Sequence, residues 1–119
     1  MDKDLQARQE ARDLAKQAGL AQKELFTFPQ EKLNAITRAV ARAFSAAAPE
    51  LAHMAVEETG FGNVSDKITK NQFASRTVLE AIEPMKCVGI LKEEPGLWEV
   101  GVPVGVIAAI VPSTNPTST

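Results

Sequence analysis

The sequence has little of what metal-binding, disulfide-linked and membrane-spanning proteins need. It contains one cysteine, Cys87, and one histidine, His53. A single cysteine forms no internal disulfide, and these two side chains lack the spacing of metal ligands, so we expect no bound metal. We treat His53 as a surface or half-buried packing residue. No apolar run reaches the about 20 residues that span a membrane, and the charged amino-terminal stretch argues against a secretory signal. We therefore expect a cytoplasmic protein.

An excess of charge of one sign is also missing. Thirteen basic and fifteen acidic side chains give a net charge of -2, and no block of like charge occurs. Proteins that bind nucleic acid or an anionic membrane surface usually carry a basic patch, so neither partner is expected. The 45% hydrophobic and 24% charged residues are ordinary for a globular protein, and 119 residues suffice for one domain at most.

Helical periodicity covers most of the first 86 residues. Apolar residues recur at steps of three and four from Lys3 to about Phe26, which predicts an amphipathic helix. Gly19 either ends this helix or lies within it, so one long helix and two short ones both stay open. A second helix is predicted from about Thr27 to Ala48.

Prolines and glycines divide the rest of the helical region. Pro49 is expected to interrupt the second helix, so a third, shorter helix is predicted between it and Gly60. Asn63 and Asp66 resemble a capping pair that begins a fourth helix. That helix should end before Pro84, because proline disfavours helix for the residue that precedes it.

After Pro84 the period changes from helical to extended. Segments 87–91 and 97–100 flank Pro95-Gly96, a dipeptide typical of tight turns, so we predict a β-hairpin within residues 87–103. A two-stranded hairpin buries too little apolar surface to be stable alone. Its apolar side chains, Trp98 among them, should therefore pack either on the chain's own helices or on a partner molecule.

The last stretch, residues 104–119, combines an apolar run with a polar turn. Val104 to Val111 is rich in β-branched residues, which is typical of a strand buried on both faces of a parallel sheet. Pro112-Ser-Thr-Asn-Pro116 follows it, and α/β sheets bind ligands in turns at the carboxyl ends of their strands. Because the preceding residues cannot supply neighbouring strands, we expect the chain to be an amino-terminal fragment.

This stretch resembles the first cofactor-domain strand and turn of the aldehyde dehydrogenase superfamily, most closely its CoA-acylating, acetaldehyde dehydrogenase-type branch. Residues 56–62, Val-Glu-Glu-Thr-Gly-Phe-Gly, and 66–71, Asp-Lys-Ile-Thr-Lys-Asn, carry further similarity. The resemblance runs from about Leu14 to Thr119. It implies an α/β, aldehyde dehydrogenase-like fold: residues 1–86 as the N-terminal helical part of the cofactor-binding domain, 87–103 as the β-hairpin of the oligomerisation region, and 104–119 as the first strand and turn of a Rossmann-like core.

The resemblance also implies a function. Enzymes of this branch oxidise an aldehyde to an acyl-CoA through a cysteine thioester, with NAD or NADP as cofactor and coenzyme A as co-substrate. Cys87 does not match the family's catalytic cysteine, which lies far downstream, so the chain alone is expected to be inactive. The hairpin at 87–103 would join copies of the protein into a homo-oligomer.

The polar turn carries the candidate site. The resemblance implies that an amide or hydroxyl in it stabilises the oxyanion: the acylating pattern Pro-x-Thr-Asn-Pro favours Asn115, whereas an ungapped match to the hydrolytic pattern Pro-Trp-Asn-x-Pro gives this role to Thr114. No Gly-x-Gly-x-x-Gly is present, and the family does not require it. The residues implied to border the nicotinamide end of the cofactor are Ile110, Val111, Pro112, Ser113 and Thr114.

Two other interpretations stay open. The residues by themselves also fit a non-catalytic interaction module of helices and a hairpin, and Asn-Pro alone is an ordinary turn initiator. Within the enzyme class, a hydrolytic aldehyde dehydrogenase is the nearer alternative, although in the ungapped match Ser113 stands where such enzymes have a tryptophan and Thr114 where they have the asparagine. A coding sequence that continues past Thr119 into a cofactor domain would favour the enzyme.

Overall fold

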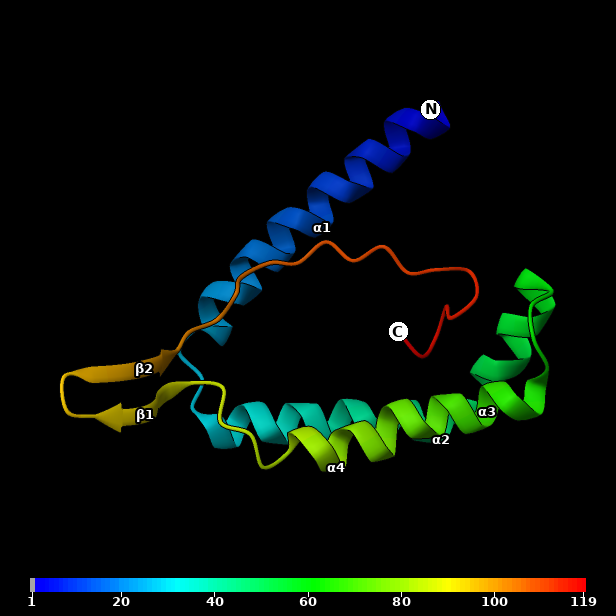
Figure 1. Cartoon of the computed structure of the whole chain (residues 1–119). Helices are drawn as coiled ribbons and strands as arrows, with labels where there is room; N and C mark the ends of the chain where they lie inside the picture. The colour runs from blue at the N-terminus through cyan, green and yellow to red at the C-terminus, as the bar shows by residue number, and fades with distance from the viewer. Residues whose placement is uncertain (1) are drawn as a thin grey trace. The chain divides into compact units, whose positions relative to one another are not determined.

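Residues 2–119 are described by a computed structural model, in which the chain divides into two compact units. The hairpin unit comprises Met1–Gln30 and Lys86–Ala108, and the helical unit comprises Glu31–Met85 and Ala109–Thr119. The elements in chain order are α1 (Lys3–Leu25), α2 (Gln30–Thr59), α3 (Val64–Gln72), a π-helical turn η1 (Phe73–Thr77), α4 (Val78–Ile82), β1 (Gly89–Glu94) and β2 (Leu97–Gly101) (Figure 1).

In the hairpin unit, α1 is one unbroken helix. It continues through Gly19, so the single long helix is the correct one of the two predicted alternatives. None of the residues of α1 is buried, and its leucines Leu5, Leu14 and Leu20 are 56%, 66% and 68% exposed. The apolar stripe that predicted this helix therefore stays largely uncovered in the described chain.

The predicted hairpin is confirmed. β1 and β2 pair antiparallel, with Ile90 opposite Val100 and Glu94 opposite Leu97. Gly96 has a φ of 81°, which the second central position of a type II turn after proline requires. The side-chain oxygen of Gln30 accepts hydrogen bonds from the backbone amides of Cys87, at 2.7 Å, and Val88, at 3.4 Å, and so fixes the chain just before β1.

In the helical unit, the prediction that Pro49 interrupts a helix is wrong. α2 runs from Gln30 through Pro49 to Thr59, although a proline inside a helix costs about 3 kcal/mol. Packing offsets this cost: Ala48, Ala52 and Ala55 are 0%, 0% and 2% exposed and form the apolar core of the unit. The predicted third helix is thus the second half of α2, which ends, as expected, at Gly60.

The fourth predicted helix is confirmed between Asn63 and Ile82, but it is not uniform. The Asn63 side chain caps α3 by accepting from the backbone amide of Asp66, at 2.9 Å. The helix then widens into η1 and returns to α-helical geometry in α4. At its end, Glu83 accepts a hydrogen bond from Arg38 of α2, which joins the two helices.

The predicted strand from Val104 to Val111 does not form here. Residues 102–111 have no regular secondary structure, and β1 and β2 are the paired strands among residues 2–119. A strand exists only beside a hydrogen-bonded neighbour, and Ile107 and Ile110 are 72% and 98% exposed instead. The Rossmann-like core and the boundaries at 86 and 103 stay predictions, although the two compact units group the chain differently.

Across the described residues, every helix is too short or too polar to cross a membrane. A cytoplasmic location stays a prediction from the sequence.

The close approach at Gly101 gives a stability prediction. A Cβ at this position would lie 2.4 Å from the backbone oxygen of Cys87, which a rigid backbone cannot accommodate. Gly101→Ala should therefore destabilise the hairpin unit by about 1–3 kcal/mol, measured as a lower urea midpoint of Trp98 fluorescence. Gly19→Ala is the control, for which the stability should rise rather than fall. A Cβ added at Gly19 meets no atom within 4 Å, and alanine should stabilise α1 by up to about 1 kcal/mol. An unchanged midpoint for Gly101→Ala would contradict the close approach.

Candidate functional site

The polar turn of residues 112–119 belongs to the helical unit and is closed by its own hydrogen bonds. The backbone amide of Asn115 donates to the carbonyl oxygen of Pro112, at 3.2 Å. The Thr119 hydroxyl donates to the carbonyl oxygen of Asn115, at 2.8 Å. Two bonds to one residue hold the backbone around Asn115 in a compact loop.

One face of α3 holds this turn. Lys67, 4% exposed, donates from Nζ to the backbone oxygen of Thr114 at 3.1 Å, and Lys70 donates to the side-chain oxygen Oδ1 of Asn115. Asn71 Oδ1 accepts from the hydroxyl of Thr117 at 2.8 Å. Because side chains three and four positions apart lie on the same face of a helix, these three α3 residues act together on consecutive parts of the turn.

Asn71 also connects α3 to α2. Its side chain is fully buried, and its Nδ2 donates to the backbone oxygen of Ala48 at 3.2 Å. The Ser75 hydroxyl donates to the backbone oxygen of Asn71 at 2.9 Å. The amide of Asn71 thus bonds two segments that are distant in sequence, and the position of the turn depends on it.

The contact with Lys70 decides how the Asn115 amide is oriented. An ammonium group has only donors, so the atom that faces it must be the amide oxygen. Nδ2 of Asn115 consequently points the other way, where it lies 3.4 Å from the hydroxyl oxygen of Thr114. That contact is long, and an amide nitrogen carries two hydrogens, so Asn115 retains a donor for another acceptor.

The structure brings together the two residues predicted to stabilise an oxyanion. Asn115 is half-buried and Thr114 is exposed, and their side chains are in contact. The candidate cofactor-binding residues are exposed as well: Ile110, Val111, Pro112 and Ser113, in addition to Thr114. They present an apolar edge followed by two hydroxyl groups.

Sequence reasoning did not single out the polar face of α3. Asp66 is predicted to take part in the helix cap, whereas the similarity of residues 66–71 to a family segment assigns no role to Lys67, Lys70 or Asn71. The signal that was available is the spacing of Lys67, Lys70 and Asn71, which places long donor side chains on one helical face. Helix periodicity does not say whether such a face meets solvent or another segment, so their contact with the turn could not be predicted.

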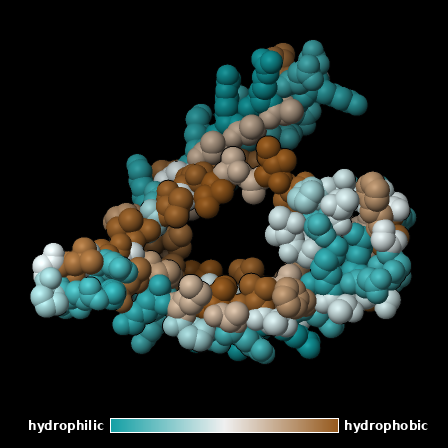
Figure 2. Space-filling model, viewed as in Figure 1, coloured by the Kyte–Doolittle hydropathy of each residue, from teal (hydrophilic) through white to brown (hydrophobic). Residues whose placement is uncertain are grey.

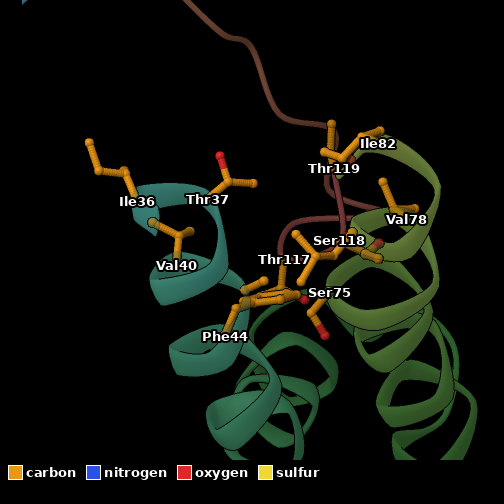
Figure 3. A pocket seen from close by; sticks show the side chains of 13 residues that line it. Ile36, Thr37, Val40, Phe44, Ser75, Val78, Ile82, Thr117, Ser118 and Thr119 are labelled. Atoms are coloured by element: carbon orange, nitrogen blue, oxygen red, sulfur yellow. The ribbon is translucent and has the colours of Figure 1, made fainter. Parts of the chain in front are cut away.

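Two hollows border the turn. One, of about 370 Å³, is lined by Phe61, Gly62, Asn63, Asp66, Lys67, Lys70 and Thr114. The other, of about 570 Å³, is mainly apolar and lies between α2 and the η1–α4 segment, with Thr117–Thr119 at its edge. Figure 3 shows Phe44 projecting from α2 and Val78 from α4, with Thr117 and Ser118 between the two helices. Hydrophobic residues also line this side of α2 and α4 in Figure 2.

The remaining candidates, Cys87 and His53, lie outside residues 112–119. Cys87 is exposed in the hairpin unit, where the amide nitrogen of Gln30 donates to its sulfur at 3.4 Å. His53 lies exposed on α2, as expected for a surface residue. Within residues 2–119, no group of three His, Cys, Asp or Glu side chains is placed to hold a metal ion.

Comparison with known proteins finds relatives along most of the chain. The bifunctional aldehyde-alcohol dehydrogenase AdhE of Escherichia coli K12 is 46% identical over 101 residues, which cover 83% of this chain and 11% of that protein. The succinate-semialdehyde dehydrogenase (acetylating) of Clostridium kluyveri is 38% identical over 110 residues, 91% of this chain and 24% of that one. No family model matches.

Solved structures give the same result. An acetylating aldehyde dehydrogenase from Geobacillus thermoglucosidasius is 48% identical, with a TM-score of 0.95 over 99% of this chain and 26% of its own. A probable aldehyde dehydrogenase from Listeria monocytogenes is 50% identical, with a TM-score of 0.96 over 100% of this chain and 27% of its own. The chain thus spans about a tenth to a quarter of these relatives' length.

The buried amide of Asn71 gives a second stability prediction. Asn71→Ala removes the partners of the Ala48 carbonyl and the Thr117 hydroxyl, so it should destabilise the helical unit by about 2–3 kcal/mol, measured by urea unfolding followed by circular dichroism. Thr117→Val removes only one of these bonds and should cost about 1 kcal/mol. Gln72→Ala, at the neighbouring position, is the control and should stay within about 0.5 kcal/mol. Equal stability of Asn71→Ala and Gln72→Ala would show that Asn71 does not hold the unit together.

Proposed function

This chain belongs to the acylating branch of the aldehyde dehydrogenase superfamily, and we propose that it forms part of an enzyme that converts an aldehyde, coenzyme A and NAD or NADP into an acyl-CoA and the reduced cofactor. The observation that carries the proposal is 48% identity to an acetylating aldehyde dehydrogenase across nearly the whole chain. The names of the relatives, acetylating or aldehyde-alcohol dehydrogenases, support this reaction over the hydrolytic alternative.

The turn's part in this reaction would be to stabilise negative charge. When a thiolate attacks an aldehyde carbon, the carbonyl oxygen becomes an oxyanion, and a fixed donor beside it lowers the barrier by about 3 kcal/mol. Asn115 suits this role because its oxygen is held by Lys70 while its Nδ2 faces the other way. The attacking cysteine would come from outside this chain, since Cys87 does not match the position of the family's catalytic cysteine.

The cofactor would meet residues 110–114. When bound, NAD or NADP accepts the hydride that leaves the aldehyde carbon. The exposed side chains of Ile110 and Val111 fit one apolar wall beside a nicotinamide ring, where they would orient it and exclude water. They supply no phosphate-binding groups, so the chain alone should neither hold the cofactor nor reduce it when given aldehyde and coenzyme A.

A chimera can test the role of Asn115. In it, this chain replaces the equivalent segment of the Geobacillus thermoglucosidasius enzyme. Asn115→Ala should lower both kcat and kcat/KM by about 100- to 1000-fold, because the lost donor acts mainly in the transition state. The KM for NAD should change little. NADH formation with acetaldehyde and coenzyme A is the measurement.

Thr114→Val is the matched variant. If it causes the large loss while Asn115→Ala stays within about threefold of the parent, the donor is Thr114 and the ungapped alignment is correct. A folded parent chimera without activity would instead favour the non-catalytic interaction module.

The hairpin would serve assembly. Ile90 pairs with Val100, and Trp98 lies two residues before Val100, so these three side chains share one face of the ribbon. They are 49%, 54% and 62% exposed in the order Ile90, Val100, Trp98. An apolar cluster of this kind fits an interface, and we propose that this face joins copies of the protein into a homo-oligomer.

Replacing the tryptophan tests this interface in the chimera. Trp98→Lys places a charge on the apolar face but can still pair with Glu93 across the strands, so the hairpin should survive. The mass measured by light scattering should fall to that of a smaller assembly. Leu97→Lys is the control, because Leu97 pairs with Glu94 on the opposite face and should leave the mass unchanged. Loss of assembly in both variants would indicate a damaged hairpin, and an unchanged mass in both would place the interface elsewhere.

A further inference from the structure

We propose that Lys70 is a positioning residue, which holds the Asn115 amide in the one orientation that presents an N–H to the developing oxyanion. The inference rests on the proposed function and adds to it a residue from a separate helix. Its basis is the hydrogen bond from Lys70 Nζ to Asn115 Oδ1, between residues 45 positions apart in the sequence.

The helix that carries Lys70 is itself fixed at both ends. Asn63 caps its first turn, and Asn71 bonds to the Ala48 carbonyl of α2 in its last turn. Lys70 is half-buried, which limits the freedom of its long side chain. A donor on such a support can hold a turn residue in place more accurately than one on a loop.

The chemistry of the contact selects one of two amide orientations. Rotation of the Asn115 amide by half a turn would bring its N–H donors against the ammonium of Lys70, where no acceptor exists for either group. The observed orientation is therefore the favoured one, and it directs Nδ2 away from Lys70. The positive charge of Lys70 beside the amide oxygen also draws electron density from the amide nitrogen, which strengthens its N–H as a donor.

Lys67 binds a different part of the turn. Its contact distinguishes support of the turn's backbone from orientation of the Asn115 amide. It is nearly fully buried, and it donates to the backbone oxygen of Thr114 rather than to a side chain. Its aliphatic chain also packs under Gly62, where an added Cβ would lie 3.3 Å from Lys67 Cε. Lys67 therefore holds the backbone of the turn, whereas Lys70 acts on the amide alone.

The test uses the chimera described above. Lys70→Met should lower kcat by about ten- to hundredfold, a part of the Asn115→Ala loss, while the KM values for aldehyde and NAD stay within about threefold. Lys70→Arg, which still offers only donors to the amide oxygen, should recover kcat to within about fivefold of the parent. Lys16→Met, at an exposed position of α1, is the control for loss of a lysine and should have no effect.

A double variant distinguishes positioning from general support. If Lys70 acts through Asn115, Lys70→Met should cause no further loss in a chimera that already carries Asn115→Ala. Multiplied losses in the double variant would overturn the inference, and so would a fall in kcat that follows a lower unfolding temperature and persists in Lys70→Arg. If Lys70→Met matches the parent while Asn115→Ala is impaired, this inference fails and the proposed function stands. If Asn115→Ala is also unimpaired, the proposed role of the turn fails with it.

Discussion

The side-chain amide of Asn71 is the interaction on which the helical unit depends. An amide buried without partners costs free energy, so a fully buried asparagine persists only where its donor and its acceptor are both satisfied. Here the donor binds a carbonyl of α2 and the acceptor binds a hydroxyl of the turn. Two helices and the turn are thereby fixed to one another through one side chain, in a unit whose apolar core consists of three alanines.

The small size of those alanines explains why hydrogen bonds between buried polar groups determine how the segments of this unit are positioned. Ala48, Ala52 and Ala55 fill little volume, so they let the α3 segment approach α2 closely but bury little apolar surface. Lys67, Asn71 and Ser75 are buried in the same unit, and each has a hydrogen-bond partner. These buried hydrogen bonds fix the positions of the helices and the turn more than they increase the free energy of unfolding. Hydrogen bonds require particular distances, whereas apolar contacts tolerate small shifts.

Features that depend on neighbouring residues were predictable from the sequence. The Asn63 cap, the helix end at Gly60 and the turn at Pro95-Gly96 follow from local backbone preferences, and all are found. The continuation of α2 through Pro49 was not predictable, because the contact beside the proline, between Ala48 and Asn71, joins residues 23 positions apart in the sequence. The same holds for the candidate site: residues 114 and 115 were identified from their own motif, whereas the role of Lys70 depends on a contact that no local pattern reveals. Residues 104–111 show the converse case, since their composition predicts a buried strand and the described residues offer it no neighbour.

The π-helical turn at 73–77 has a consequence for how this segment can change over evolution. A π turn acts as one residue inserted into an α-helix, and it rotates everything after it by about 100° relative to everything before it. In a regular α-helix, the separation of 11 positions from Lys67 to Val78 and from Asn71 to Ile82 would place the members of each pair about 20° apart around the axis. With the π turn they lie about 80° apart, so the side chains that hold the polar turn and those that line the apolar hollow occupy adjacent sides of one helix. Loss of one residue between 73 and 77 would restore a regular α-helix and keep this offset, whereas gain of one residue would change it. The segment should therefore accept a deletion here more readily than an insertion.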